Sequence, residues 1–284
     1  MSPRAISPAT LPRAKAYSIA TLVTKPDQYA RMVASLRAGG FDGGDCEYLY
    51  LDNTGGNALS AYQGLNRLLD EAEGERILLC HQDLLLLDDG RAVLDARLAQ
   101  LDKLAPHWGL AGNAGGVAPG RLAIRLTDPH GRDVAIGTLP ERVQSLDENF
   151  IVVRREARLS FSSDLQGFHF YGTDLCLQAE IAGWSAHVID FHLEHLSGGL
   201  KTADFYVCEQ SLREKYSHAF RSRWLQTTCA LISISASPML NIIGGAVAQP
   251  YAKLSRRLPG ARGWSRPLPS IPRSTDTRPV GTRG

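Results

Sequence analysis

A carboxylate that directly follows an apolar strand is the first group that could do chemistry. Residues 77–80 are apolar, and His81, Gln82 and Asp83 come next. A carboxylate held at the mouth of a sheet suits Mg²⁺ or Mn²⁺, because these cations prefer oxygen ligands and usually share them with substrate phosphates. Asp83 could equally cap the segment that follows it, and its position alone leaves both readings open.

Two further polar segments have a chemical and a structural reading. Residues 52–57 combine side-chain acceptors with two glycines, which suits the edge of a nucleobase or ribose but also an ordinary turn. Asp174 follows Gly172 and Thr173 at the expected start of a helix. It could be a general base for a hydroxyl, or a carboxylate that stabilises the helix N-terminus. Taken alone, the structural reading is favoured for both segments.

Two histidines and a glutamate stand together at His192, Glu194 and His195, without the spacing of an HExxH metal site. On an extended strand, His192 and Glu194 share one face and His195 points the other way. The three side chains therefore cannot bind one ion unless the strand has ended. His195 comes just before the Ser-Gly-Gly segment 197–199, where a ligand could sit.

The elements that position these residues are expected to alternate between strand and helix. The expected strands are 17–23, 48–51 and 76–80, and the expected helices are 26–38, 59–69 and 91–104. Pro26 begins the first helix, and Asp88 and Asp89 cap the third. Such alternation predicts a parallel, doubly wound sheet, whose ligands bind at the carboxyl ends of the strands. The loops expected there are 24–27, 52–57 and 81–83.

The second half is expected to add mixed strand pairing to this sheet. Residues 122–127 and 134–136 predict a hairpin around a turn that begins with Asp128 and Pro129. The other expected elements are a helix over 174–183 and strands at 150–153 and 186–193.

Four segments are expected along the 284 residues. They are a disordered lead-in (1–15), a catalytic α/β domain (16–200), a helical, apolar extension (201–252) and a basic Pro/Arg-rich tail (253–284). The net charge is only +2, which gives no sign of nucleic-acid binding. Five cysteines without a CxxC pair, and an N-terminus without an apolar signal core, predict a cytoplasmic protein.

The extension contains no Lys, Arg, Asp or Glu between Arg223 and Lys253. Its length would cross a bilayer, for which about 20 residues suffice, but its polar residues and Pro238 argue against a membrane span. It could lie on the inner face of a membrane, with the basic tail attracted to anionic lipid. It could equally be a helical pair that packs against the catalytic domain or a second subunit.

Several enzyme classes are disfavoured by missing motifs. The sequence has no P-loop, no GxSxG elbow, no cysteine zinc signature and no GxGxxG after a strand. A nucleotidyltransferase would be expected to carry a basic, glycine-rich loop after its first strand, and residues 24–27 do not form one.

The order of these segments resembles the family 2 glycosyltransferases of GT-A fold, and more narrowly their StrF-like branch. The resemblance covers residues 16–199 and rests on the segments 48–54, 77–83, 146–155 and 171–175 together with His195. It implies an inverting glycosyltransferase that uses a nucleoside-diphosphate sugar and Mn²⁺ or Mg²⁺.

The resemblance also implies roles for individual residues. For the donor these are Thr21, Asp52, Asn57, His81, Gln82 and Asp83. It implies metal binding by Asp83 and His195, and a general base at Asp174. The expected sugar and acceptor pocket consists of Asp147, Glu148, Gly172 and Thr173. Two departures stand out, because the DxD element reads His81-Gln82-Asp83 and the Glu-Asp pair at the base reads Thr173-Asp174.

The acceptor implied is a glycan, a lipid-linked glycan or a small molecule, and a homo-oligomer is compatible with the sequence. The alternative function is a non-catalytic scaffold protein of the same fold that binds a nucleotide-sugar. The weakened DxD element at His81-Gln82-Asp83 supports this alternative, whereas the presence of both Asp83 and Asp174 favours an enzyme.

Overall fold

A computed structural model of the chain describes residues 15–199, 201–226 and 231–255. Its contacts divide the chain into two compact units, residues 1–214 and 215–284. The lead-in expected before residue 16 and the tail expected from residue 253 lie almost wholly outside the described residues.

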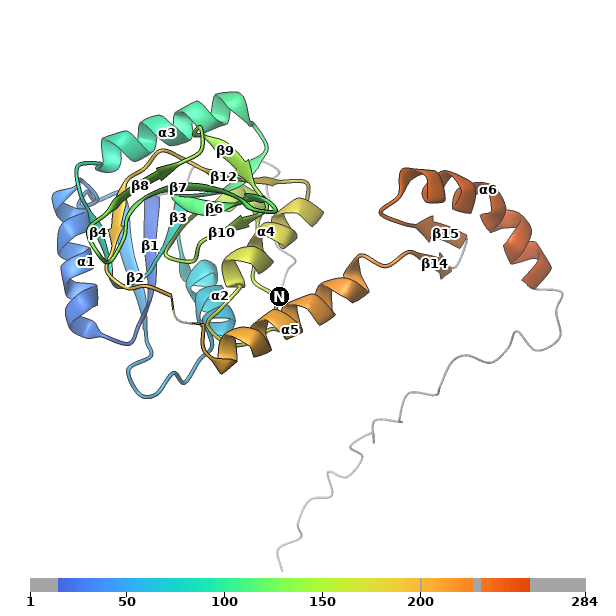
Figure 1. Ribbon diagram of the computed structural model, residues 1–284, viewed down its shortest axis with the longest axis horizontal. Helices are drawn as coiled ribbons and strands as arrows, with labels where there is room; N and C mark the ends of the chain where they lie inside the picture. The colour runs from blue at the N-terminus through green and yellow to red at the C-terminus, as the bar shows by residue number, and fades with distance from the viewer. Residues whose placement is uncertain (1–14, 200, 227–230, 256–284) are drawn as a thin grey trace, which may run out of the picture. The chain divides into compact units, whose positions relative to one another are not determined.

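The first unit is built on a seven-stranded sheet in the order β2-β1-β3-β11-β5-β12-β9 (Figure 1). In that order the strands are Cys46–Asp52, Lys15–Val23, Gly74–Cys80, Phe150–Arg154, Trp108–Gly112, Ser185–Val188 and Glu141–Val143. β11 and β9 pair antiparallel to their neighbours, and the other strands pair in parallel. The predicted mixed sheet of the GT-A-like fold is thereby confirmed.

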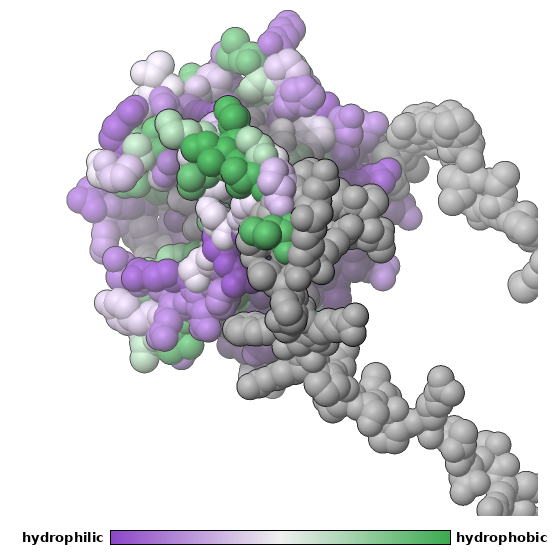
Figure 2. Space-filling view, turned by 90° about the vertical axis from the view of Figure 1, so that its right-hand side faces the viewer, coloured by the Kyte–Doolittle hydropathy of each residue, from purple (hydrophilic) through white to green (hydrophobic). Residues whose placement is uncertain are grey.

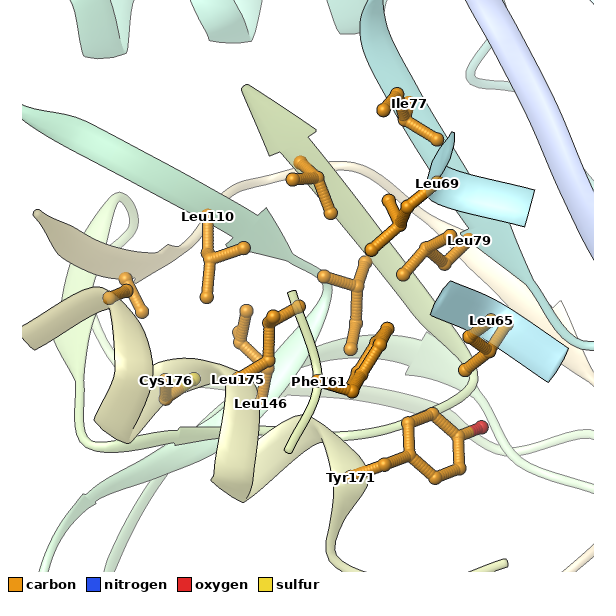
Figure 3. Packing of buried hydrophobic residues seen from close by; sticks show 14 of the residues in the cluster. Leu65, Leu69, Ile77, Leu79, Leu110, Leu146, Phe161, Tyr171, Leu175 and Cys176 are labelled. Carbon is orange, nitrogen blue, oxygen red and sulfur yellow. The ribbon is translucent and has the colours of Figure 1, made fainter. Parts of the chain in front are cut away.

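Helices cover both faces of this sheet, as a doubly wound fold requires. α2 (Ala61–Glu71) and α4 (Tyr171–Ile181) pack in one core cluster, and α1 (Pro26–Ala38) and α3 (Arg91–Leu104) pack in another. Figure 3 shows the first cluster, in which leucines of α2 and α4 meet strand residues such as Ile77. Burying each such side chain contributes roughly 1.5–3 kcal/mol.

Local sequence explains where the first two helices begin. Pro26 occupies the first turn of α1, where its missing N–H costs nothing. α2 begins with a capping box, in which Ser60 accepts from the Gln63 N–H and the Gln63 side chain accepts from the Ser60 N–H. Leu59, which the apolar spacing placed in this helix, lies before the cap.

The expected carboxylate cap of α3 is wrong. The N-cap residue is Gly90, with no side-chain hydrogen bond. Asp89 instead accepts a hydrogen bond from the His192 N–H at 2.7 Å. The carboxylate therefore anchors a segment that is distant in the sequence.

A second sheet crosses the first unit in the order β10-β6-β7-β13-β4, with β8 paired to β7. Its strands are Ser145–Leu146, Ala114–Ala118, Arg121–Thr127, Leu193–His195, Leu84–Leu86 and Asp133–Ile136. β7 and β8 form the predicted hairpin. The strand expected over 186–193 is in fact two strands, because β12 ends at Val188 and β13 joins the second sheet.

The C-terminal part of the chain contains strands as well as helices. α5 (Ala203–Ala219) is followed by a hairpin of β14 (Arg223–Gln226) and β15 (Leu231–Ile234), and then by α6 (Pro238–Ser255). The two helices make up most of the range 201–252, which was expected to be mostly helical, and the hairpin between them was not expected. Among the described residues, no helix is both long and apolar enough to span a membrane.

Large apolar side chains are exposed along α6. Met239 is 68% exposed and Ile242 is 74% exposed, and no charged residue precedes Lys253 on this helix. The space-filling view shows hydrophobic side chains gathered at the surface between hydrophilic ones (Figure 2). A contiguous exposed apolar surface is typical of an interaction site.

Candidate active site

Two strand pairings bring His81, Asp83 and His195 together. β3 ends at Cys80, so that His81 and Asp83 follow at its carboxyl end. β13 pairs with β4 so that His195 lies opposite Leu84, and the Leu196 N–H donates to the Asp83 carbonyl. His195 therefore reaches the end of β3 from the second sheet.

The three side chains converge on one point. His195 Nε2 lies 3.5 Å from Asp83 Oδ1 and 3.4 Å from His81 Nδ1, and His81 Nδ1 lies 4.0 Å from Asp83 Oδ1. Two atoms that each bind one ion at about 2.1 Å are at most about 4.2 Å apart. All three separations satisfy this limit, so the residues fit a single metal ion.

The kinds of ligand narrow the choice of metal. Imidazole nitrogens suit transition metals, and carboxylate oxygens suit Mg²⁺, Ca²⁺ and Mn²⁺. Two histidines and one aspartate therefore fit a divalent metal ion that accepts both nitrogen and oxygen ligands. When bound, such an ion supplies positive charge that a diphosphate can share.

Both residues on the β3 side have the protonation state that a metal ligand needs. Burial and the neighbouring His195 lower the pKa of His81, which keeps its imidazole neutral near pH 7. Burial alone would raise the pKa of Asp83, but hydrogen bonds with His195 and Ser197 outweigh it and hold that pKa below its usual value. A neutral imidazole and an ionised carboxylate are the metal-binding forms.

Tyr171, the first residue of α4, orients His81. Its hydroxyl donates to the Glu148 carbonyl at 3.2 Å and lies 2.7 Å from His81 Nε2. While the hydroxyl donates its one proton to the Glu148 carbonyl, it accepts from a protonated Nε2, and this tautomer leaves the lone pair of Nδ1 facing Asp83 and His195. Figure 3 shows the Tyr171 ring at the edge of the core cluster, with its oxygen directed away from the apolar side chains.

Gln82 shapes the loop that follows β1. Its Oε1 accepts from the N–H groups of Thr24 and Lys25, both at 2.8 Å, and its Nε2 donates to Thr24 Oγ1. The carboxamide is therefore committed to holding this loop. Gln82 lies beside the candidate metal site, and its side chain holds the loop; its predicted contact with the donor stays a prediction.

A cavity of about 330 Å³ opens beside the three metal-binding candidates. Its lining includes four residues predicted to bind the donor, namely Asn57, His81, Gln82 and Asp83. Lys25 and Ser197 also line it. A lysine in a cavity of this size, next to a candidate cation site, provides a setting for a diphosphate.

The structure does not bring the other two predicted donor contacts into this cavity. Thr21 is fully buried in β1, and its hydroxyl has no hydrogen-bond partner among the described residues. Asp52 is exposed at the end of β2, and its carboxylate accepts from the Thr54 N–H and hydroxyl. These two hydrogen bonds lower the pKa of Asp52 and give it the turn-forming role.

A second cavity, of about 300 Å³, contains most of the predicted sugar and acceptor pocket. Asp147, Glu148 and Thr173 line it, together with Phe170 and with Phe205 of α5. The two phenylalanine rings have centroids 4.6 Å apart and form an apolar wall. The Gly172 N–H faces Glu148 Oε1 at 3.4 Å, beside this cavity.

The structure places Asp174 away from both cavities. It is fully buried in the first turn of α4, and its carboxylate accepts from the Ser162 N–H at 2.8 Å and the Ser162 hydroxyl at 2.7 Å. A general base must reach the hydroxyl that it deprotonates. In this structure the carboxylate anchors the segment before α4, and the base expected at Asp174 stays a prediction.

Sequence reasoning missed two residues of the site. Tyr171 carried no signal, because its role depends on a contact with His81 across 90 residues. Lys25 lies in the loop 24–27, whose place at the carboxyl end of the first strand was a usable signal.

The chain is similar to known proteins in structure and in sequence. No family model matches it. The mannosyltransferase PcManGT from Pyrobaculum calidifontis, in complex with GDP-Man and Mn²⁺, is 14% identical, with a TM-score of 0.49 over 86% of this chain and 72% of that one. TarS from S. aureus is 14% identical, with a TM-score of 0.44 over 64% of this chain and 36% of that one.

Another protein is much more similar to this chain in sequence than these two structures are. The protein described as ATP synthase subunits region ORF 6, from Fuscovulum blasticum, is 34% identical over 226 residues. These residues make up 77% of this chain and 90% of the relative. The chain therefore belongs to the family of the ATP synthase subunits region ORF 6 protein.

Proposed function

We propose that this protein is a glycosyltransferase that transfers a sugar from a nucleoside-diphosphate donor, with Mn²⁺ held by His81, Asp83 and His195. The observation that carries the proposal is the convergence of these three side chains beside a cavity that His81 and Asp83 line, at the carboxyl ends of parallel strands. The resemblance to family 2 glycosyltransferases, and to their StrF-like branch, belongs to the same proposal.

In this proposal each cavity binds a different part of the reactants. Lys25 and the adjacent candidate metal site would bind the diphosphate, and Asn57, which also lines the first cavity, would contact the nucleoside. The second offers the aromatic wall and two carboxylates, Asp147 and Glu148, to the sugar and the acceptor. Carboxylates beside aromatic rings suit a ligand with several hydroxyl groups.

The acceptor in this proposal is a glycan, a lipid-linked glycan or a small molecule. The exposed apolar residues of α6 and the basic composition of residues 253–284 support a cytoplasmic protein that binds the inner face of a membrane peripherally. A lipid-linked acceptor is consistent with that location.

A donor panel tests the function. Purified full-length protein is mixed with UDP-, GDP- and dTDP-sugars in Mn²⁺, Mg²⁺ or EDTA, and its melting temperature and the release of nucleoside diphosphate are measured. We expect one donor to stabilise the fold and to be cleaved only with metal. Asp83→Ala abolishes both effects. Glu194→Ala, which removes a carboxylate from the same strand as His195 but outside the cluster, leaves both intact.

Other results would assign a different role. Donor binding without cleavage under any condition, including with candidate acceptors, supports the non-catalytic scaffold. No stabilisation by any donor or nucleoside diphosphate contradicts the glycosyltransferase proposal.

A further inference from the structure

Glu148 lies where the two cavities meet. Among the described residues, it is the one that lines both the cavity beside the metal-binding candidates and the cavity with the aromatic wall. On the basis of the glycosyltransferase function proposed above, we propose that Glu148 is the general base that removes the proton from the acceptor hydroxyl. A base for glycosyl transfer must touch the acceptor while the acceptor touches the donor, and this junction meets that requirement.

Strand pairing fixes Glu148 at this place. β11 pairs antiparallel with β3, and the His81 N–H donates to the Asn149 carbonyl, so that the segment before β11 lies alongside the end of β3. The Glu148 carbonyl accepts from the Tyr171 hydroxyl, and its carboxylate faces the Gly172 N–H. Main-chain and side-chain contacts therefore hold the residue between β3 and α4.

Gly172 has no room for a carboxylate of its own. A Cβ atom at this position would lie 2.4 Å from the Leu146 carbonyl oxygen and 3.3 Å from Glu148 Cγ. Glu148 thus fills the space in front of the first turn of α4. The Leu146 backbone excludes a side chain at position 172, and Glu148 from the neighbouring loop supplies the carboxylate that faces this turn.

The other two nearby carboxylates are less suited to the role. Asp174 is fully buried and bonded to Ser162. Asp147 lines only the second cavity, and its Oδ1 accepts from the backbone and side-chain N–H groups of Asn149. Glu148 alone of the three reaches the donor side.

The surroundings of Glu148 also suit a proton acceptor. Burial and the negative charge of Asp147 raise the pKa of Glu148 to about 8, although the N–H groups at the start of α4 act against the rise. A base works best when its pKa lies near the working pH. Besides Asp147, the titratable groups that line the same cavities are Tyr171 on α4, Cys80, His81 and Asp83 at the end of β3, Lys25 after β1 and His169 before α4.

The step is a direct displacement. The acceptor oxygen forms a bond to the anomeric carbon, and its proton passes to a carboxylate oxygen of Glu148. The bond from the anomeric carbon to the diphosphate oxygen breaks, and its electron pair leaves with the nucleoside diphosphate. Attack on the face opposite the leaving group inverts the anomeric carbon.

The test compares Glu148→Gln with the wild type, using the donor selected by the panel and water as the probe acceptor. The amide keeps the shape of the side chain but cannot take up the proton. We expect metal-dependent stabilisation by the donor to persist and cleavage to fall by about 100-fold or more. Glu148→Asp restores part of the rate, and Glu194→Gln is the matched control with normal cleavage.

The pH profile gives a second measurement. A carboxyl with a raised pKa is protonated at low pH, so wild-type cleavage should rise with pH up to about 8. The residual rate of Glu148→Gln should lack this rise.

Three results overturn the assignment, and they are distinguishable. Cleavage by Glu148→Gln within about threefold of the wild type rejects Glu148 and leaves the glycosyltransferase proposal standing. Loss of donor stabilisation in Glu148→Gln assigns the residue to binding. A wild-type protein that binds no donor, or binds it without cleavage, rejects the proposed enzyme and its base together.

Discussion

The hydroxyl of Tyr171 and Nε2 of His81 lie 2.7 Å apart, although 90 residues separate them in the chain. This contact joins the start of α4 to the end of β3 and turns the free nitrogen of His81 toward Asp83 and His195. Partners that orient a metal ligand in this way typically change metal affinity about 10–100-fold when they are removed.

Tyr171→Phe is therefore expected to weaken Mn²⁺ binding by about tenfold or more while the protein remains folded. Calorimetric titration with Mn²⁺ measures the change. Tyr62→Phe is the control, because the Tyr62 hydroxyl donates to the His169 carbonyl and not to a metal-binding candidate. Equal Mn²⁺ affinity in Tyr171→Phe and the wild type would contradict the orienting role.

Gln82→Ala should weaken donor binding without removing the metal site. The substitution deletes three hydrogen bonds to Thr24 and Lys25, so the loop that carries Lys25 loses its anchor. We expect the KM for the donor to rise about 3- to 10-fold, in line with roughly 1 kcal/mol per net hydrogen bond in an exposed setting. Gln82→Glu keeps an acceptor for the two N–H groups and should show the smaller change. An unchanged KM in both variants would show that the loop is held by other contacts.

Asp174→Ala should reduce stability more than catalysis. The buried Ser162 N–H and hydroxyl lose their acceptor, and an unsatisfied buried polar group costs about 1–3 kcal/mol. Urea unfolding measures the free energy of unfolding, and cleavage is assayed where the variant is fully folded. Ser162→Ala, which removes only the hydroxyl, is the milder control. A folded Asp174→Ala protein with cleavage reduced by 100-fold would instead indicate that Asp174 is the general base.

The apolar surface of α6 predicts peripheral binding to anionic membranes. The full-length protein should sediment with vesicles that contain phosphatidylserine, and far less with neutral phosphatidylcholine vesicles. Ile242→Ser combined with Met239→Ser should weaken this binding, because both side chains are largely exposed. Higher salt should also weaken it, through screening of the basic residues 253–284. Equal binding to neutral vesicles at every salt concentration would contradict the electrostatic part, and no binding to either kind would contradict the whole prediction.

The sequence by itself determined most of the architecture. Apolar runs and helical spacing were sufficient for β1, β2, β3 and the helices between them, because each of these elements buries one continuous face and is bounded by local signals such as Pro26. The same alternation predicted that ligands bind at the carboxyl ends of the strands, which led directly to His81 and Asp83.

Only the tertiary structure decided which side chains share a site. His195 reaches Asp83 because a strand expected to be continuous breaks after Val188 and its second part pairs with β4. Asp174 and Glu148 are both acidic residues near α4, yet one is enclosed with Ser162 and the other lies between two cavities. Local sequence specifies the periodicity of an element, whereas the depth and direction of a carboxylate depend on long-range packing.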